Sequence, residues 1–150
     1  MNGVTLGRGN LSRTNNYAFG YQALASVSAA TGNNGNYNNA FGHQALTANT
    51  TGQQNSAFGE YVLPKNIGGN YNTAMGTQAL KENTSGSGNT GFGQQALQTN
   101  TTGANNTALG YQADVSSATL SNATAIGYGA KVATSNTIQL GNTAVTNVST

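Results

Sequence analysis

A short pattern of hydrophobic and polar positions recurs from one end of the chain to the other. A small residue, a large apolar residue and a glycine follow one another, as in Ala74, Met75 and Gly76. With the glycine as reference, the copies fall at Gly7, Gly20, Gly42, Gly59, Gly76, Gly93, Gly110, Gly127 and Gly141. From Gly42 to Gly127 the step is always 17 residues. Such a period is too short for a helical hairpin or a propeller blade, and it suits one coil of a β-solenoid built from two short strands and two turns.

The repeat predicts an all-β chain organised as one solenoid domain over residues 1–150, with about nine coils. Its main irregularity lies between Gly20 and Gly42, where the step grows to 22 residues and makes room for an enlarged loop at 25–37. The interval before Gly141 shortens to 14 residues. We therefore expect a regular stack that is modified near both ends.

The residue before each reference glycine is always large and apolar. We call the residues at one equivalent position of successive repeats a column, and this large apolar column contains every phenylalanine of the chain. The column comprises Leu6, Phe19, Phe41, Phe58, Met75, Phe92, Leu109, Ile126 and Leu140. The position before it is nearly always small, and successive strand residues point to opposite faces. We expect the small column inside the coil and the large column on an outer face covered by another copy of the chain, although the pattern also permits the reverse. In either case a single stack leaves an apolar ridge, which favours association.

Other columns of the repeat predict where the coil is buried and where it turns. Alanine and leucine recur three and four residues after the glycine, until Asp114 and Lys131 replace leucine. The register of burial, that is, which positions of the repeat point into the core, should therefore change there. The position directly after the glycine is chemically mixed, with His43 among its members, and is expected to face solvent. Segments such as 49–52, Asn-Thr-Thr-Gly, have turn chemistry. Stacked at strand spacing, they would form Asn and Thr ladders along one edge.

Composition narrows the function classes further. Charged residues make up only 5% of the chain, the formal net charge is +2, and the basic residues form no stripe, so a nucleic-acid partner is not expected. Without cysteine, neither disulfides nor thiolate metal sites are available. No apolar run approaches the roughly 18 residues of a membrane span, and the first residues lack the features of a secretory signal peptide. Export by another route, or origin as part of a longer protein, is therefore expected.

Candidate chemistry is sparse, and we expect no enzymatic activity, no cofactor and no metal site. The three acids Glu60, Glu82 and Asp114 occupy different columns of the repeat, and His43 is the only histidine. Six of the seven tyrosines can stack on sugars if several share a face, but turn packing is the simpler interpretation. They are Tyr17, Tyr21, Tyr37, Tyr71, Tyr111 and Tyr128. The enlarged loop is the candidate for a ligand contact, through Asn33, Asn34, Asn36 and Tyr37.

Two stretches carry a resemblance to known repeats. They are Asn-Thr-Ala-Leu-Gly-Tyr-Gln-Ala at 106–113, and the closing run formed by 125–132 and 136–148. The repeats resemble the shaft repeats of bacterial and phage tail-fibre-domain proteins, and they are similar to the head repeats of trimeric autotransporter adhesins of the YadA-like type. The resemblance covers essentially the whole chain. It implies a homotrimer of left-handed parallel β-rolls, with the large apolar column at the threefold axis, and an extracellular role in attachment on a cell surface or a tail-fibre particle.

The leading hypothesis is therefore a structural and adhesive fibre segment, a rigid trimeric rod of roughly 40 Å if about nine coils stack at strand spacing. One alternative is a subunit that polymerises end to end into an extracellular filament. Another is a solenoid that binds carbohydrate or ice through a regular face. The expected partners are further copies of the chain and a cell-surface glycan or receptor.

Overall fold

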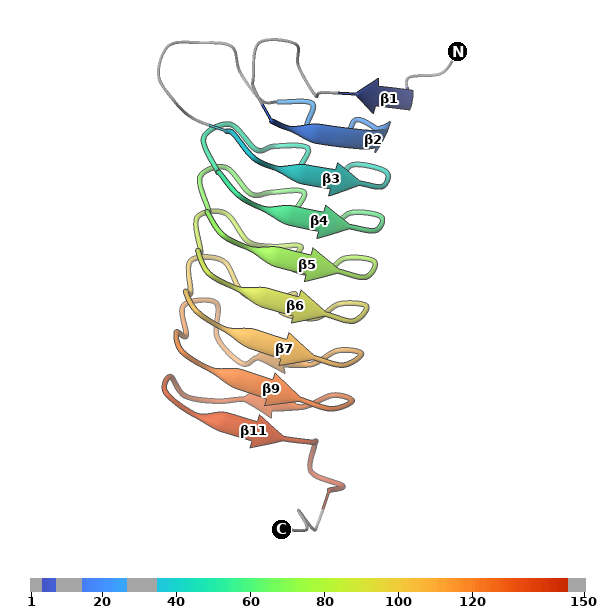
Figure 1. Ribbon diagram of the computed structural model, residues 1–150. Helices are drawn as coiled ribbons and strands as arrows, with labels where there is room; N and C mark the ends of the chain where they lie inside the picture. The colour runs from blue at the N-terminus through green and yellow to red at the C-terminus, as the bar shows by residue number, and fades with distance from the viewer. Residues whose placement is uncertain (1–3, 8–14, 27–34, 146–150) are drawn as a thin grey trace.

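The computed structural model describes residues 4–7, 15–26 and 35–145, and these form a β-solenoid without helices (Figure 1). The main sheet has nine strands in the order β1-β2-β3-β4-β5-β6-β7-β9-β11. Their bounds are β1 Val4–Gly7, β2 Tyr17–Tyr21, β3 Asn39–Phe41, β4 Ser56–Phe58, β5 Thr73–Met75, β6 Thr90–Phe92, β7 Thr107–Leu109, β9 Thr124–Ile126 and β11 Ile138–Leu140. A two-stranded sheet joins β8 (Asp114–Val115) and β10 (Lys131–Val132). The predicted β-solenoid is confirmed.

Neighbouring strands from β2 to β11 pair in parallel, and equivalent residues of the repeat lie beside one another. Phe58, for example, is in register with Met75. The strand β1 differs, because it pairs antiparallel with β2 and places Leu6 opposite Phe19. The copy of the repeat at Gly7 therefore adds no coil to the parallel stack, a reversal that the sequence pattern does not signal.

The small column faces the interior and the large apolar column faces outward. Ala40, Ala57 and Ala74 have no exposed surface, whereas the apolar residue that follows each of them is more than one-third exposed. The leucines from Leu24 to Leu97 complete the core, and Val62 takes an alanine position within it. Of the two assignments that the sequence left open, the structure shows the one with alanine inside.

The prediction of two strands in every coil is wrong. In the coils that carry leucine, the wall after the bend contains residues with left-handed backbone, such as Gln78 at φ 63° and Leu80 at φ 51°. This twist turns both Ala79 and Leu80 toward the core. Within the described part of the chain, a second strand forms only in the coils of Gly110 and Gly127, as β8 and β10.

The predicted change in the register of burial is confirmed at these two strands. Val115 and Val132 fill the interior in place of the leucines, while Asp114 and Lys131 lie on the outer side of the wall. Asp114 and Lys131 stand at the position where Leu80 and Leu97 have left-handed backbone, and neither of them has a positive φ. Extended backbone here forms β8 and β10 and turns the valine that follows inward.

Asparagine occupies the interior as well, in two buried ladders rather than along an outer edge as predicted. One ladder comprises Asn16, Asn38, Asn55, Asn72, Asn89 and Asn106, and the other Asn49, Asn66, Asn83 and Asn100. The Asn72 side-chain amide donates to the carbonyl of Gly86 at 2.9 Å, and its oxygen accepts from the backbone N–H of Asn89 at 2.9 Å. Each amide thus pairs backbone groups that the narrow interior hides from water.

The turn glycine leaves the space that these amides need. A Cβ atom at Gly86 would lie 2.4 Å from the carbonyl oxygen of Gly103 and 2.5 Å from Oδ1 of Asn83. The threonine part of the predicted ladder does lie at the turn, where the hydroxyl of Thr84 donates to the carbonyl of Thr101 in the next coil at 3.2 Å. The Asn-Thr-Ser/Thr-Gly turns thus stabilise the stack from both its interior and its edge.

Candidate functional site

The outward apolar column forms a continuous strip along the sheet, which we call the apolar ridge. It consists of Phe19, Phe41, Phe58, Met75, Phe92, Leu109, Ile126 and Leu140. The exposed fraction of these side chains runs from 36% for Phe92 to 52% for Phe19. The rings of Phe41 and Phe58 stack with their centroids 5.0 Å apart. A contiguous strip of large apolar side chains on a solvent-exposed surface favours association with another molecule. For Leu6, the structure describes only the backbone pairing with Phe19.

The rest of this outer face carries no charge from β2 to β11. The other outward column, at the first position of the three-residue strands and at the corresponding position of β2, comprises Tyr17, Asn39, Ser56, Thr73, Thr90, Thr107, Thr124 and Ile138. Four consecutive threonines thus lie beside the ridge on the strands, not only in the turns. An uncharged face of apolar and hydroxyl groups loses little solvation when a partner covers it.

The charged side chains of the described residues lie on other parts of the coil. Glu60 directly follows the glycine of the bend. The other charged residues come later in their coils, after the inward-facing alanine or valine, and are Lys65, Lys81, Glu82, Asp114 and Lys131. Lys65 and Glu82 form an ion pair at 2.5 Å. Charge is thus segregated from the apolar ridge, as expected if the ridge is an interface and the opposite wall meets solvent.

His43 lies in an aromatic stack rather than freely in solvent. Its ring is parallel to that of Tyr21 at 5.4 Å and meets the edge of Tyr61 at 5.0 Å, and its Nδ1 atom is 3.8 Å from the carboxylate of Glu60. The side chain is half-buried. This stack packs consecutive coils against one another, and it brings no nucleophile beside the histidine among the residues that the structure describes.

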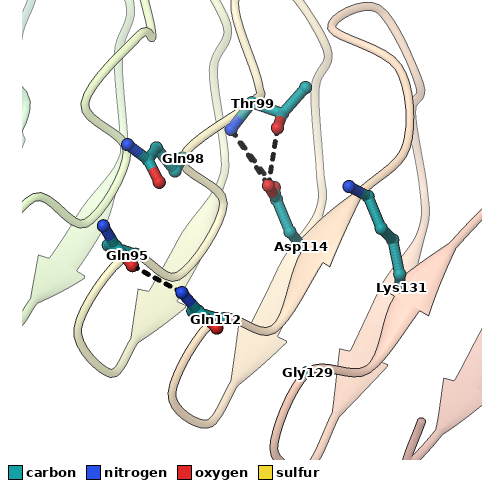
Figure 2. Close-up of a pocket in the computed structure, with 7 residues that line it drawn as sticks. All are labelled: Gln95, Gln98, Thr99, Gln112, Asp114, Gly129 and Lys131. Carbon is teal, nitrogen blue, oxygen red and sulfur yellow. Dashed lines mark hydrogen bonds between the residues drawn. The ribbon is translucent and has the colours of Figure 1, made fainter.

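A polar depression of about 380 Å³ lies where the repeat changes, lined by Gln95, Gln98, Thr99, Gln112, Asp114, Gly129 and Lys131 (Figure 2). The Asp114 carboxylate is almost completely buried and accepts hydrogen bonds from the Thr99 hydroxyl at 2.6 Å and from the backbone N–H of Val115 at 2.8 Å. Burial raises the pKa of Asp114, against the opposing effects of these hydrogen bonds and of the Lys131 charge. Sequence reasoning noted the change at Asp114 but did not identify a depression.

The predicted ligand loop receives no comparable geometry. Asn33 and Asn34 lie outside the described residues. Tyr37 is exposed and has a left-handed backbone with φ 60°, and the backbone carbonyl of Asn36 accepts a hydrogen bond from Gln54 at 3.0 Å. Their positions belong to the turn of the coil, so the described part of the loop shows turn structure rather than a gathered set of ligand-binding side chains.

Within the described ranges, no group of three or more metal-binding acids or histidines comes together. Those ranges also contain no helix that is long and apolar enough to cross a membrane. Comparison with protein-family profiles, with curated proteins and with solved structures gives no match to the chain.

Proposed function

We propose that the chain is the shaft segment of an adhesive fibre, in which three copies pack their apolar ridges against one another around a common axis. In this arrangement the chains are left-handed parallel β-rolls, and the rod spaces or presents an extracellular receptor-binding part. The observation that carries the proposal is the apolar ridge itself. It extends from β2 to β11 without a charged residue on its face.

The geometry of the ridge favours a long partner with the same repeat. Successive ridge side chains are separated by the distance between neighbouring strands, about 4.8 Å. A second copy of the chain presents apolar side chains at that same spacing, so each coil can meet its counterpart along the whole strip. Three ridges around a common axis cover one another along their whole length.

The interior is suited to a rigid spacer. The two buried asparagine ladders tie each coil to the next through side-chain amides, in addition to the backbone bonds between strands. Such a stack resists bending between coils because a bend would break several buried hydrogen bonds at once. Stiffness of this kind is what a shaft requires.

The alternative of an end-to-end filament receives less support. Continuous growth requires the last strand of one molecule to pair with the first strand of the next in the same parallel register. At the N-terminal end, β1 runs antiparallel to β2, so a parallel coil added there would meet a strand of opposite direction. This favours a segment of fixed length over a growing polymer.

The solution mass of the purified chain, measured by light scattering over a concentration series, tests the proposal. We expect the mass of three chains at every concentration. Phe58→Asp places a charge in the middle of the ridge and should yield monomers, because burying an unpaired carboxylate is costly. Gln94→Asp, at an exposed position after a bend, is the matched control and should remain trimeric. A wild-type monomer, or a trimer of Phe58→Asp, would refute the ridge as the interface.

Ice binding is a second candidate because of the threonine column on the strands. Thr73, Thr90, Thr107 and Thr124 follow one another at strand spacing beside the ridge. An ice-binding solenoid needs such a face open in solution, whereas the trimer covers it. A monomer with thermal hysteresis would therefore favour this candidate, and a trimer without hysteresis would exclude it.

A further inference from the structure

The polar depression arises from three departures from the repeat within consecutive coils (Figure 2). Asp114 and Lys131 stand where the preceding coils have leucine. Gly129 stands two residues after its reference glycine, where the coils from Gly20 to Gly110 carry glutamine or, once, tyrosine. Two charged groups are thus added to the wall, and one side chain is removed beside them.

The missing side chain interrupts a ladder of glutamine amides. The amide of Gln95 donates to Oε1 of Gln78 at 3.3 Å, and that of Gln112 donates to Oε1 of Gln95 at 2.9 Å. Each glutamine therefore uses its N–H on the preceding coil and offers its oxygen to the following one. The oxygen of Gln112 faces the coil of Gly129, which has no side chain to donate to it. An acceptor is left open at the depression.

The two charges remain apart although their residues are paired in register. Lys131 and Asp114 are partners in the β10–β8 ladder, yet no ion pair joins them among the described residues. The Asp114 carboxylate is held by Thr99, while the Lys131 ammonium makes no hydrogen bond or ion pair to any other described residue. Figure 2 shows the Lys131 side chain on one side of Asp114 and the side chains of Gln98 and Gln112 on the other.

We infer that this depression binds one unit of a neutral saccharide. A ligand here would donate hydrogen bonds to the Gln112 oxygen and the Asp114 carboxylate. It would also accept hydrogen bonds from Lys131 and the Gln98 amide. A sugar hydroxyl can both donate and accept. The negative Asp114 opposes an anionic ligand and the positive Lys131 opposes a cationic one. The volume of about 380 Å³ lies within the range of small-molecule sites.

The site is independent of the fibre proposal. All its residues come from one chain and none belongs to the apolar ridge. In a trimer the site is repeated three times, so weak binding of single units would be reinforced when one polysaccharide or one glycan-coated surface engages several copies.

Gly129→Gln is the sharpest test, because it restores the residue of the other coils. Gly129 has φ 60°, close to the 57° of Gln112, and an added Cβ atom would meet nothing closer than 3.6 Å. The new amide can donate to the open oxygen of Gln112 and occupy the depression. Lys131→Met removes the cation alone, and Lys81→Met is the matched control, because it removes a charge from the same wall outside the depression.

Binding is measured by saturation-transfer NMR on the full chain with methyl α-mannopyranoside, methyl β-galactopyranoside and methyl β-glucopyranoside. We expect saturable binding of at least one glycoside with a Kd of about 1 to 10 mM. Lys131→Met should weaken it about tenfold, Gly129→Gln should abolish it, and Lys81→Met should leave it unchanged. Thermal melting checks that each variant is folded, and Lys131→Met decides the outcome if Gly129→Gln is not. Absence of binding to all three glycosides, or binding that survives both substitutions, would overturn the inference.

Discussion

Replacement of Asn72 by alanine tests whether the buried asparagine ladders hold the coils together. Asn72 lies in the middle of the longer ladder and has no exposed surface. Its side chain makes two hydrogen bonds, one to the carbonyl of Gly86 and one from the backbone N–H of Asn89, both at 2.9 Å. The substitution leaves the backbone N–H of Asn89 without a partner, whereas the carbonyl of Gly86 keeps its hydrogen bond from the Asn83 amide at 3.0 Å.

The magnitude follows from this N–H group. A buried donor or acceptor that loses its partner costs about 1 to 3 kcal/mol. Because only the N–H of Asn89 is left unpaired, Asn72→Ala should lower the free energy of unfolding by about 1 to 3 kcal/mol. A water molecule that entered the space left by the side chain would hydrogen-bond to the unpaired backbone and bring the loss of unfolding free energy toward the lower figure.

Urea denaturation followed by circular dichroism measures the effect, at one fixed protein concentration because unfolding is expected to be coupled to dissociation. Thr77→Ala is the control, since Thr77 belongs to the same coil, lies after the bend and off the ridge face, is half-buried, and makes no side-chain hydrogen bond within the described structure. Its stability should stay within about 0.5 kcal/mol of wild type. If Asn72→Ala proved as stable as Thr77→Ala, the ladder would not stabilise the fold.

Two further substitutions test the close stacking of the bends and the buried acid. Gly76→Ala should destabilise the fold by about 3 kcal/mol or more, because Gly76 has φ 118° and its Cβ atom would lie 2.6 Å from the backbone carbon of Gly93. Gly91→Ala, at a position that is alanine in the other coils from Gly20 to Gly127, should be tolerated in the same melting experiment, and equal losses for the two variants would contradict the clash. Burial raises the pKa of Asp114 above its ordinary 3.8, so the folded state holds this proton more tightly than the unfolded state. The contribution of Asp114 to stability is therefore present below pH 3.8 and is lost as the pH rises through the elevated pKa. The Tm of wild type relative to Asp114→Asn should fall over that window, and a constant or rising difference would refute the assignment.

The period and the columns of the repeat predicted the solenoid and the change at Asp114, and they favoured an outward ridge while leaving the reverse assignment open. This succeeded because a parallel in-register stack places identical positions side by side, so the chemistry of each column must satisfy one environment repeated many times. A large apolar residue such as Phe58, alternating with an alanine, could face only one way once the coil interior was too narrow to hold it.

Other features depended on contacts between coils. The sequence could not show that Asn72 is interior, because burial of an amide depends on whether the backbone groups around it take up its donors and acceptor. The left-handed backbone at Leu80, a residue type that rarely adopts it, follows from packing toward the core. The reversal of β1 is likewise set by pairing with β2.

The depression proposed to bind a saccharide likewise depends partly on the sequence and partly on the tertiary structure. The sequence by itself identified Asp114 and Lys131 as breaks in a column, and it contained the glycine at 129. Only the tertiary structure brought the open oxygen of Gln112, the free ammonium of Lys131 and the gap at Gly129 to one place, because residues about 17 apart become neighbours only when the coils stack. Repetition determines what each coil looks like, and stacking determines what an exception to the repetition can do.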